Sequence, residues 1–237
     1  MKYELTSETK KIGTVVLYRI KALRSFGDCK TGDLGGWIGK ESNLSQEGNA
    51  WVSGDARVSG DAKVYGNAWV YENAWVFGDA QVYGKAQVYG KALVYGKALV
   101  YGDAQVFGNT LVYGDAWVDG KSRVYGDARV SGDAWVSGDA QVYGDALVYG
   151  KAWVSGDALV YDDALVYGDA QVYGKALVYG DAWVDGKSRV YGDARVSGNT
   201  RISGNTRVYG DAPTPNVTES ECVSIGGKKY RLVEVKD

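Results

Sequence analysis

The chain has 237 residues, a formal net charge of -2, no histidine, 34 glycines and 19 tyrosines. A near-neutral balance argues against a nucleic-acid binder, which would be basic, and against an acidic mimic of nucleic acid. No apolar run is long enough to span a membrane, and the first residues hold no apolar signal core. We therefore expect a cytoplasmic protein that does not bind membranes.

The first 47 residues are not repetitive and form the first predicted unit, 1–47. The apolar stretches at 2–5 and 14–23 predict a hairpin, with a polar turn over 6–13. Further on, Ile38 and Leu44 are six residues apart, whereas Leu44 and Val52 are eight apart. This spacing predicts an irregular first coil with a two-residue insertion.

A six-residue phrase, G-x-A-x-V-x, then runs through 27 copies from Gly48 to Tyr209, within a second predicted unit, 48–212. Val holds the fifth place in every copy except Ile202, and Ala or a small hydroxyl residue holds the third. This alternation is typical of strands with one buried face, about four residues long. Gly with Asp, Asn or Lys supplies a corner of about two residues. So short a link cannot join neighbouring parallel strands of one sheet, so successive strands lie on different sheets of one coil.

The phrase resembles the hexapeptide repeat of left-handed parallel β-helices, in which three hexads close a triangular coil. The resemblance implies an all-β, left-handed parallel β-helix of about nine regular three-sided coils with β-hairpin caps at both ends. The left-handed sense comes from the resemblance alone, because the general crossover rule favours the right-handed one.

The run GDLGGWIGKESNLSQEGNAWV, residues 32–52, resembles the start of YdcK-type hexapeptide proteins of bacteria and prophage, which are described as transferases. Hexapeptide acyltransferases use a His base at a subunit interface, and this chain has none. We therefore predict no enzyme activity, no catalytic residues, no cofactor and no metal site.

The third predicted unit, 213–237, begins where Pro213 and Pro215 end the array. Residues 221–235 predict a second hairpin around Gly226-Gly227. Cys29 and Cys222 lie on opposite sides of the array, which predicts free thiols in a reducing compartment.

Stepping by three hexads along the sequence predicts which outward side chains share a face. One predicted corner row is an aromatic ladder that includes Tyr125, Tyr143 and Tyr161. A second row, on another face, holds Trp117, Trp135 and Trp153. The third face holds an apolar row interrupted by Arg129, whose apolar members are Leu93, Leu111, Leu147, Leu165 and Trp183.

These rows have two interpretations. The ladders either stabilise the rod by stacking alone, or they form an apolar surface that a partner covers. Residues 102–132 and 168–198 are nearly identical, but their offset of eleven hexads is not a whole number of three-hexad coils. The copies should therefore lie on different faces, which favours a scaffold over a precisely built pocket.

We therefore predict a non-catalytic scaffold, of phage or prophage type by resemblance, that binds a protein partner or forms a dimer or trimer through these rows. The centre of the expected surface is the row from Trp117 to Trp153. One alternative is an acyltransferase-like protein that has lost its His and binds a small molecule between subunits. The other is a carbohydrate-binding solenoid, since Trp and Tyr faces suit sugar rings.

Overall fold

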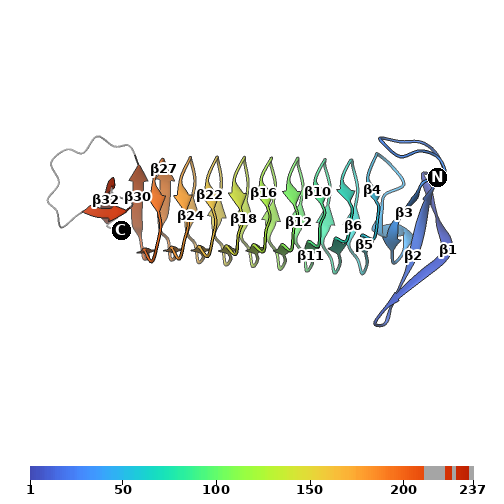
Figure 1. Cartoon of the computed structure of the whole chain (residues 1–237), viewed down its shortest axis with the longest axis horizontal. Coiled ribbons are helices and arrows are strands. Elements are labelled where there is room, and N and C mark those ends of the chain that lie inside the picture. Colours follow the sequence, from blue (N-terminus) through green and yellow to red (C-terminus); the bar gives the residue numbers. More distant parts are fainter. Residues whose placement is uncertain (211–221, 226–227, 235–237) are drawn as a thin grey trace.

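The computed structural model describes residues 1–210, 222–225 and 228–234, and its coils stack into a straight rod (Figure 1). Three sheets of 12, 9 and 11 strands run along the rod, and β4 to β30 form parallel ladders between successive coils. The predicted all-β, three-sided parallel solenoid is confirmed: the nine-stranded sheet supplies nine regular coils, and an irregular one precedes them. The left-handed sense stays a prediction of the resemblance.

Sheet 1 contains the N-terminal hairpin and one strand of each coil. Its strands are β1 (Tyr3–Ile12), β2 (Val15–Ala22), β3 (Leu34–Ile38), β5 (Arg57–Val58), β8 (Trp75–Val76), β11 (Leu93–Val94), β14 (Leu111–Val112), β17 (Arg129–Val130), β20 (Leu147–Val148), β23 (Leu165–Val166), β26 (Trp183–Val184) and β29 (Arg201–Ile202). The single 3-10 turn of the described residues, η1 (Glu41–Asn43), follows β3.

Sheets 2 and 3 contain the other two strands of each coil. Sheet 2 comprises β4 (Trp51–Val52), β7 (Trp69–Val70), β10 (Gln87–Val88), β13 (Gln105–Val106), β16 (Arg123–Val124), β19 (Gln141–Val142), β22 (Leu159–Val160), β25 (Leu177–Val178) and β28 (Arg195–Val196). Sheet 3 comprises β6 (Lys63–Val64), β9 (Gln81–Val82), β12 (Leu99–Val100), β15 (Trp117–Val118), β18 (Trp135–Val136), β21 (Trp153–Val154), β24 (Gln171–Val172), β27 (Arg189–Gly192), β30 (Thr206–Gly210), β31 (Cys222–Ile225) and β32 (Lys228–Glu234).

Most repeat strands are two residues long rather than the predicted four, because the Gly corners bend the chain on both sides. The hydrogen bonding nevertheless extends past the strands. Within one hexad the N–H groups of Asn67, Trp69 and Tyr71 donate to carbonyls of the next coil at 2.7, 2.9 and 3.0 Å. Three bonds per hexad thus hold each coil to the next.

The corners need positive φ and close contact between coils. Gly84 has φ +72, and a Cβ built on it would lie 2.9 Å from the backbone of Gly102. Glu72 and Asp162 replace Gly at φ 60 and 57. The Glu72 carboxylate accepts the N–H of Gly90 at 2.8 Å, a bond that helps to offset the cost of this conformation.

The interior contains the inward Val and Ala side chains, which are fully buried as the alternation predicts. Hydroxyl residues that replace Ala satisfy their own polar atoms: the Oγ of Ser122 donates to the carbonyl of Asp119 at 2.6 Å. The narrow core therefore accepts Ala, Ser or Thr at this place.

The N-terminal cap differs from its prediction in one respect. The predicted turn over 6–13 is wrong, because β1 continues to Ile12 and the turn lies at Gly13, where φ is +59. The polar residues 6–11 form the strand of a hairpin that projects from the rod (Figure 1). The two-residue insertion is confirmed, since Ile38 pairs with Val58 and Leu44 with Val64, and each pair is two residues further apart in sequence than three hexads.

This cap closes the end of the core. Tyr3 and Phe26 pack edge-on against Trp51, which is only 2% exposed. The Nζ of buried Lys2 donates to the carbonyl of Ala50 at 2.8 Å, and burial lowers the pKa of Lys2 to about 8. The cap therefore covers Trp51, although Trp51 occupies the same place in the repeat as the exposed Trp117.

At the other end, β31 and β32 form the predicted antiparallel hairpin. β32 pairs antiparallel with β30 and so extends sheet 3. Pro213, Pro215 and the Gly226-Gly227 turn lie outside the described residues. The duplicated blocks lie on different faces as predicted: Trp117 belongs to sheet 3 and Trp183 to sheet 1.

Candidate interaction surface

The predicted aromatic ladder is confirmed beside sheet 2. Its rings are nearly parallel, with centroids 4.7–4.9 Å apart and interplanar angles of 2–7°. The ladder comprises Tyr71, Tyr89, Phe107, Tyr125, Tyr143, Tyr161 and Tyr179. Burial in the stack raises the pKa of Tyr71 to about 12 and also raises the pKa values of Tyr125, Tyr143 and Tyr161. These half-buried rings support one another and offer little free surface.

The predicted tryptophan row lies on sheet 3, where β15, β18 and β21 pair in register. Trp117, Trp135 and Trp153 are 43%, 36% and 38% exposed. The rings of Trp117 and Trp135 meet edge to face at 5.9 Å, and those of Trp135 and Trp153 stack at 5.4 Å. We call this outward surface of β15, β18 and β21 the tryptophan face.

The row is exposed because the aromatic ladder beside it is interrupted. The sixth hexad place along sheet 3 holds Tyr before and after the row, but Asp119, Ser137 and Ser155 within it. Without a bulky neighbour the Trp rings lean over these small residues. Trp135 Nε1 donates to Asp119 Oδ1 at 3.0 Å, and Trp153 Nε1 donates to Ser137 Oγ at 3.1 Å.

A shallow groove on the tryptophan face is lined by Asp115, Trp117, Asp133 and Trp135. The two carboxylates follow the Gly corners of successive coils and are exposed. Neither carboxylate forms an ion pair within the described part of the chain. The face therefore combines an apolar centre with a charged border.

The third predicted row lies on sheet 1, apart from the other two. Its four leucines are half-buried, and Arg129 interrupts the row in register, as predicted. Trp183 is 39% exposed, but the guanidinium of Arg201 lies over its ring at 5.3 Å. The predicted residues thus occupy three sides of the rod, and only the tryptophan face forms an exposed, unbroken aromatic row.

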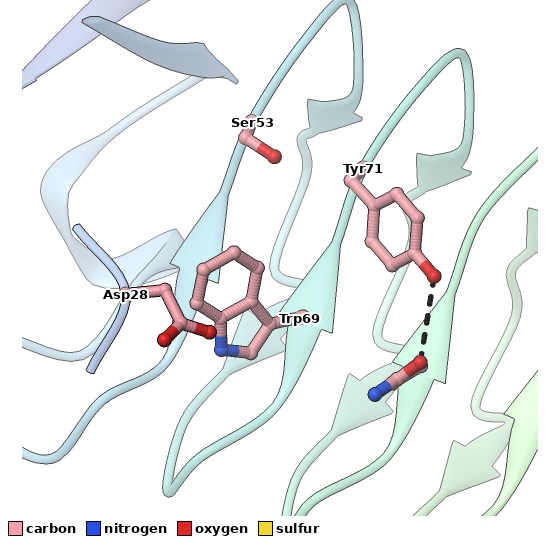
Figure 2. Close-up of a pocket in the computed structure, with 5 residues that line it drawn as sticks. Asp28, Ser53, Trp69 and Tyr71 are labelled. Atoms are coloured by element: carbon pink, nitrogen blue, oxygen red, sulfur yellow. Dashed lines mark hydrogen bonds between the residues drawn. The ribbon is translucent and has the colours of Figure 1, made fainter. Parts of the chain in front are cut away.

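A second cavity lies where the N-terminal cap meets sheet 2, lined by Asp28, Ser53, Trp69, Tyr71 and Gln87, with a volume of about 340 Å³. Figure 2 shows Trp69 between the Asp28 carboxylate and the Tyr71 ring, whose hydroxyl donates to Gln87 Oε1 at 3.4 Å. Asp28 sits in a tight turn fixed by two backbone bonds between buried Phe26 and Cys29.

A Trp hydrogen bond that recurs along the solenoid is not formed by Trp69 at this cavity. Elsewhere a Trp N–H donates to the small polar residue 16 positions before it, as Trp75 does to Ser59 at 3.1 Å. Trp69 and Ser53 have the same spacing but form no hydrogen bond, and Trp69 Nε1 has no partner among the described residues. The sequence did not predict this cavity, because spacing alone cannot show that the cap loop contacts Trp69.

Among residues 1–210, 222–225 and 228–234, no group of three or more potential metal ligands comes together. The same residues contain no helix with the length and hydropathy needed to cross a bilayer.

Comparison with protein families identifies the repeat. The family model described as the YdcK beta solenoid repeat matches residues 86–102, 122–138, 140–156, 158–174, 170–186 and 188–204. Each match spans about one three-sided coil. No curated protein matches the chain. The matches lie within the array rather than in residues 32–52, and together with the fold they show that this chain is a β-solenoid repeat protein of the YdcK type.

Proposed function

We propose that this protein is a non-catalytic scaffold that binds a protein partner or a second copy of itself through the tryptophan face. The observation that carries this proposal is the exposure of three Trp side chains in consecutive coils of one sheet. Contiguous exposed apolar surface is costly in water, and Trp is enriched at the centres of protein interfaces. The resemblance favours a phage or prophage origin, and the free, buried Cys29 is consistent with a reducing cytoplasm.

The ring geometry favours a protein over a sugar on this face. Trp135 stacks on Trp153 with an interplanar angle of 13°, so each ring covers part of the other's flat surface. A sugar ring stacks on a free aromatic surface, whereas protein side chains also pack against ring edges.

The duplicated block offers a matched test. Trp117 and Trp183 lie in identical local sequence and are similarly exposed, but they belong to different faces. We expect Trp117→Asp to abolish association, measured as native mass and as binding of a co-purified partner, and Trp183→Asp to leave it intact. Equal effects of the two variants, or none, would contradict the assignment of the tryptophan face.

Because the chain contains no His, the acyltransferase-like alternative predicts small-molecule binding between subunits rather than catalysis. Acetyl-CoA should neither bind nor raise the melting temperature. Saturable binding of acetyl-CoA in a calorimeter would favour that alternative over the scaffold.

Carbohydrate binding is a second candidate, favoured by the cavity at Trp69 rather than by the tryptophan face. This cavity, at about 340 Å³, and the groove on the tryptophan face, at about 520 Å³, both fall in the range for ligand sites, roughly 300–1,000 Å³, but this cavity adds a hydroxyl and an amide to the aromatic ring and carboxylate. Sugar hydroxyls both donate and accept hydrogen bonds, which matches Asp28 and the amide of Gln87.

The indole N–H resonance of Trp69 tests this candidate. Neutral monosaccharides and short oligosaccharides, including N-acetylglucosamine, should shift that resonance, and Asp28→Asn should weaken binding without unfolding the rod. Trp153→Ala serves as the control and should bind like the unchanged chain. No shift with any sugar at about 10 mM would remove the candidate, because such binding would be weaker than about 2.7 kcal/mol.

A further inference from the structure

Charged corner residues border the tryptophan face on both sides. They occupy the second hexad place and stack from coil to coil, since the corner N–H groups of Lys97 and Lys121 donate to corner carbonyls of the next coil. The leading column, before the Trp residues, is Asp79, Lys97, Asp115, Asp133, Lys151, Asp169 and Lys187. The trailing column, after them, is Lys85, Asp103, Lys121, Asp139, Asp157, Lys175 and Asp193.

The charges of both columns reverse sign about the coil that contains Trp135. In the leading column, Asp115 and Lys151 lie one coil before and one coil after it, and the next two pairs are also oppositely charged. In the trailing column, Lys121 and Asp157 are likewise oppositely charged, as are the next two pairs outward. A copy of this face turned end over end about the Trp135 coil would therefore meet opposite charges at the corners of the three coils on either side of the central coil, whereas Asp61, one coil further out, would meet the neutral Asn205.

The apolar centre has the same midpoint. Trp117 and Trp153 lie symmetrically on either side of Trp135, and the small residues at the sixth place are followed in both directions by tyrosines. Three tyrosines lie on each side, namely Tyr65, Tyr83 and Tyr101 before, and Tyr173, Tyr191 and Tyr209 after.

We propose that two copies of this chain associate antiparallel through the tryptophan face, about a two-fold axis at the Trp135 coil. This inference rests on the proposed function and names its partner. An isologous interface must be self-complementary, and the apolar row and the corner charges one to three coils from the axis meet that condition.

The other two faces of the rod are not self-complementary in this way. Both are bordered by the third corner column, which holds carboxylates in four successive coils: Asp127, Asp145, Asp163 and Asp181. A copy placed on either face would bring like charges together near the middle of the rod. The complementarity is thus specific to the face that carries the exposed Trp row.

The outward residues along the middle of the tryptophan face favour the antiparallel orientation. A parallel pair would also match the corner charges, because the leading and trailing columns differ in sign in the same coils. It would, however, place the exposed Arg189 directly on Arg189 of the second copy. In the antiparallel pair Arg189 lies opposite Gln81, three coils from the axis on the other side. Only Lys63 and Arg207, four coils from the axis, then bring like charges together along this row, whereas a parallel pair would set Lys63, Arg189 and Arg207 each against its own copy.

A charge-reversal cycle on the full chain tests this arrangement, with the dissociation constant measured by light scattering. Asp115→Lys and Lys151→Asp should each weaken the dimer at least about tenfold, because one change creates two repulsive contacts across a two-fold axis. The double variant should regain the original affinity. Asp145→Lys, in the third column, is the control and should change little, whereas Asp133→Asn should strengthen the dimer by removing the like charges on the axis.

Several results would overturn the antiparallel dimer. In a parallel pair Asp115 faces Lys121 of the second copy and Lys151 faces Asp157, so the double variant would be weaker than either single one. Single variants that dimerise like the unchanged chain would show that another face is used. If the chain is monomeric while Trp117→Asp still releases a different protein, the dimer is wrong and the proposed scaffold function stands.

Discussion

Trp135 Nε1 donates to Asp119 Oδ1 at 3.0 Å, whereas the equivalent carboxylate of the duplicated block, Asp185, instead forms an ion pair with Arg201 at 2.8 Å. The partner in each case belongs to the next coil, beyond the end of the duplicated sequence. Asp185 also accepts the hydroxyl of Tyr167 in the preceding coil at 2.7 Å, so the surroundings of an outward side chain depend on the neighbouring coils and not on its own hexad alone.

The bond between Trp135 and Asp119 can be tested directly. Asp119→Ala should speed hydrogen exchange at the Trp135 indole N–H several-fold, yet lower the free energy of unfolding by no more than about 1 kcal/mol, because the pair is exposed. Asp185→Ala is the matched control and should leave the Trp135 signal unchanged. An unaltered exchange rate in Asp119→Ala would show that the bond is not formed in solution.

The tyrosine stacks should stabilise the rod in proportion to the number of stacked neighbours. Tyr125 stacks on both sides, against Phe107 and Tyr143, whereas Tyr113 stacks only on Tyr95. Each stacked pair contributes about 0.5–1.5 kcal/mol beyond area burial. Tyr125→Ala should therefore cost about 1 kcal/mol more than Tyr113→Ala in chemical denaturation, and equal costs would show that stacking contributes little.

Two corner glycines allow the cost of backbone strain to be measured apart from the cost of steric contact between coils. Gly84 and Gly198 both have positive φ, but a Cβ on Gly84 would lie 2.9 Å from the backbone of the next coil, whereas a Cβ on Gly198 would meet nothing within 4 Å. Gly198→Ala should cost only the backbone strain, roughly 1 kcal/mol. Gly84→Ala should cost clearly more, because two backbones must separate, and the melting temperatures of the two variants would show it.

The repeat determined most of this fold in advance. The invariant Val, the small third residue and the Gly corner predicted three-sided coils, and the three-hexad step correctly placed the Tyr71 ladder and the Trp117 row. Strand length and the first turn were less predictable, because a Gly corner limits a ladder to two residues and polar residues 6–11 pair in a projecting hairpin.

Exposure could not be predicted from hexad position. Trp51 and Trp117 occupy the same place in the phrase, but the cap covers the first and interruption of the ladder exposes the second. The cavity at Trp69 also depends on a loop from outside the array. The repeat therefore predicts the solenoid, whereas the candidate sites lie where the repeat is interrupted or where the cap contacts it.

The stacks also predict a loss of stability at alkaline pH. Burial raises the pKa of Tyr71 to about 12 and the pKa values of other stacked tyrosines above the ordinary value of about 10. Between these values the folded chain holds more protons than the unfolded chain, so the tyrosine contribution is intact below about pH 10 and falls as pH rises above it. The melting temperature should drop above pH 10, and less steeply in Tyr71→Phe.

The native mass across a hundredfold concentration range tests the central claim most directly. An antiparallel dimer predicts a mass that reaches twice 25.5 kDa and stays there, with dissociation in Trp117→Asp and none in Trp183→Asp. A constant mass of 25.5 kDa would contradict self-association through the tryptophan face, and a mass that keeps growing with concentration would indicate end-to-end stacking instead.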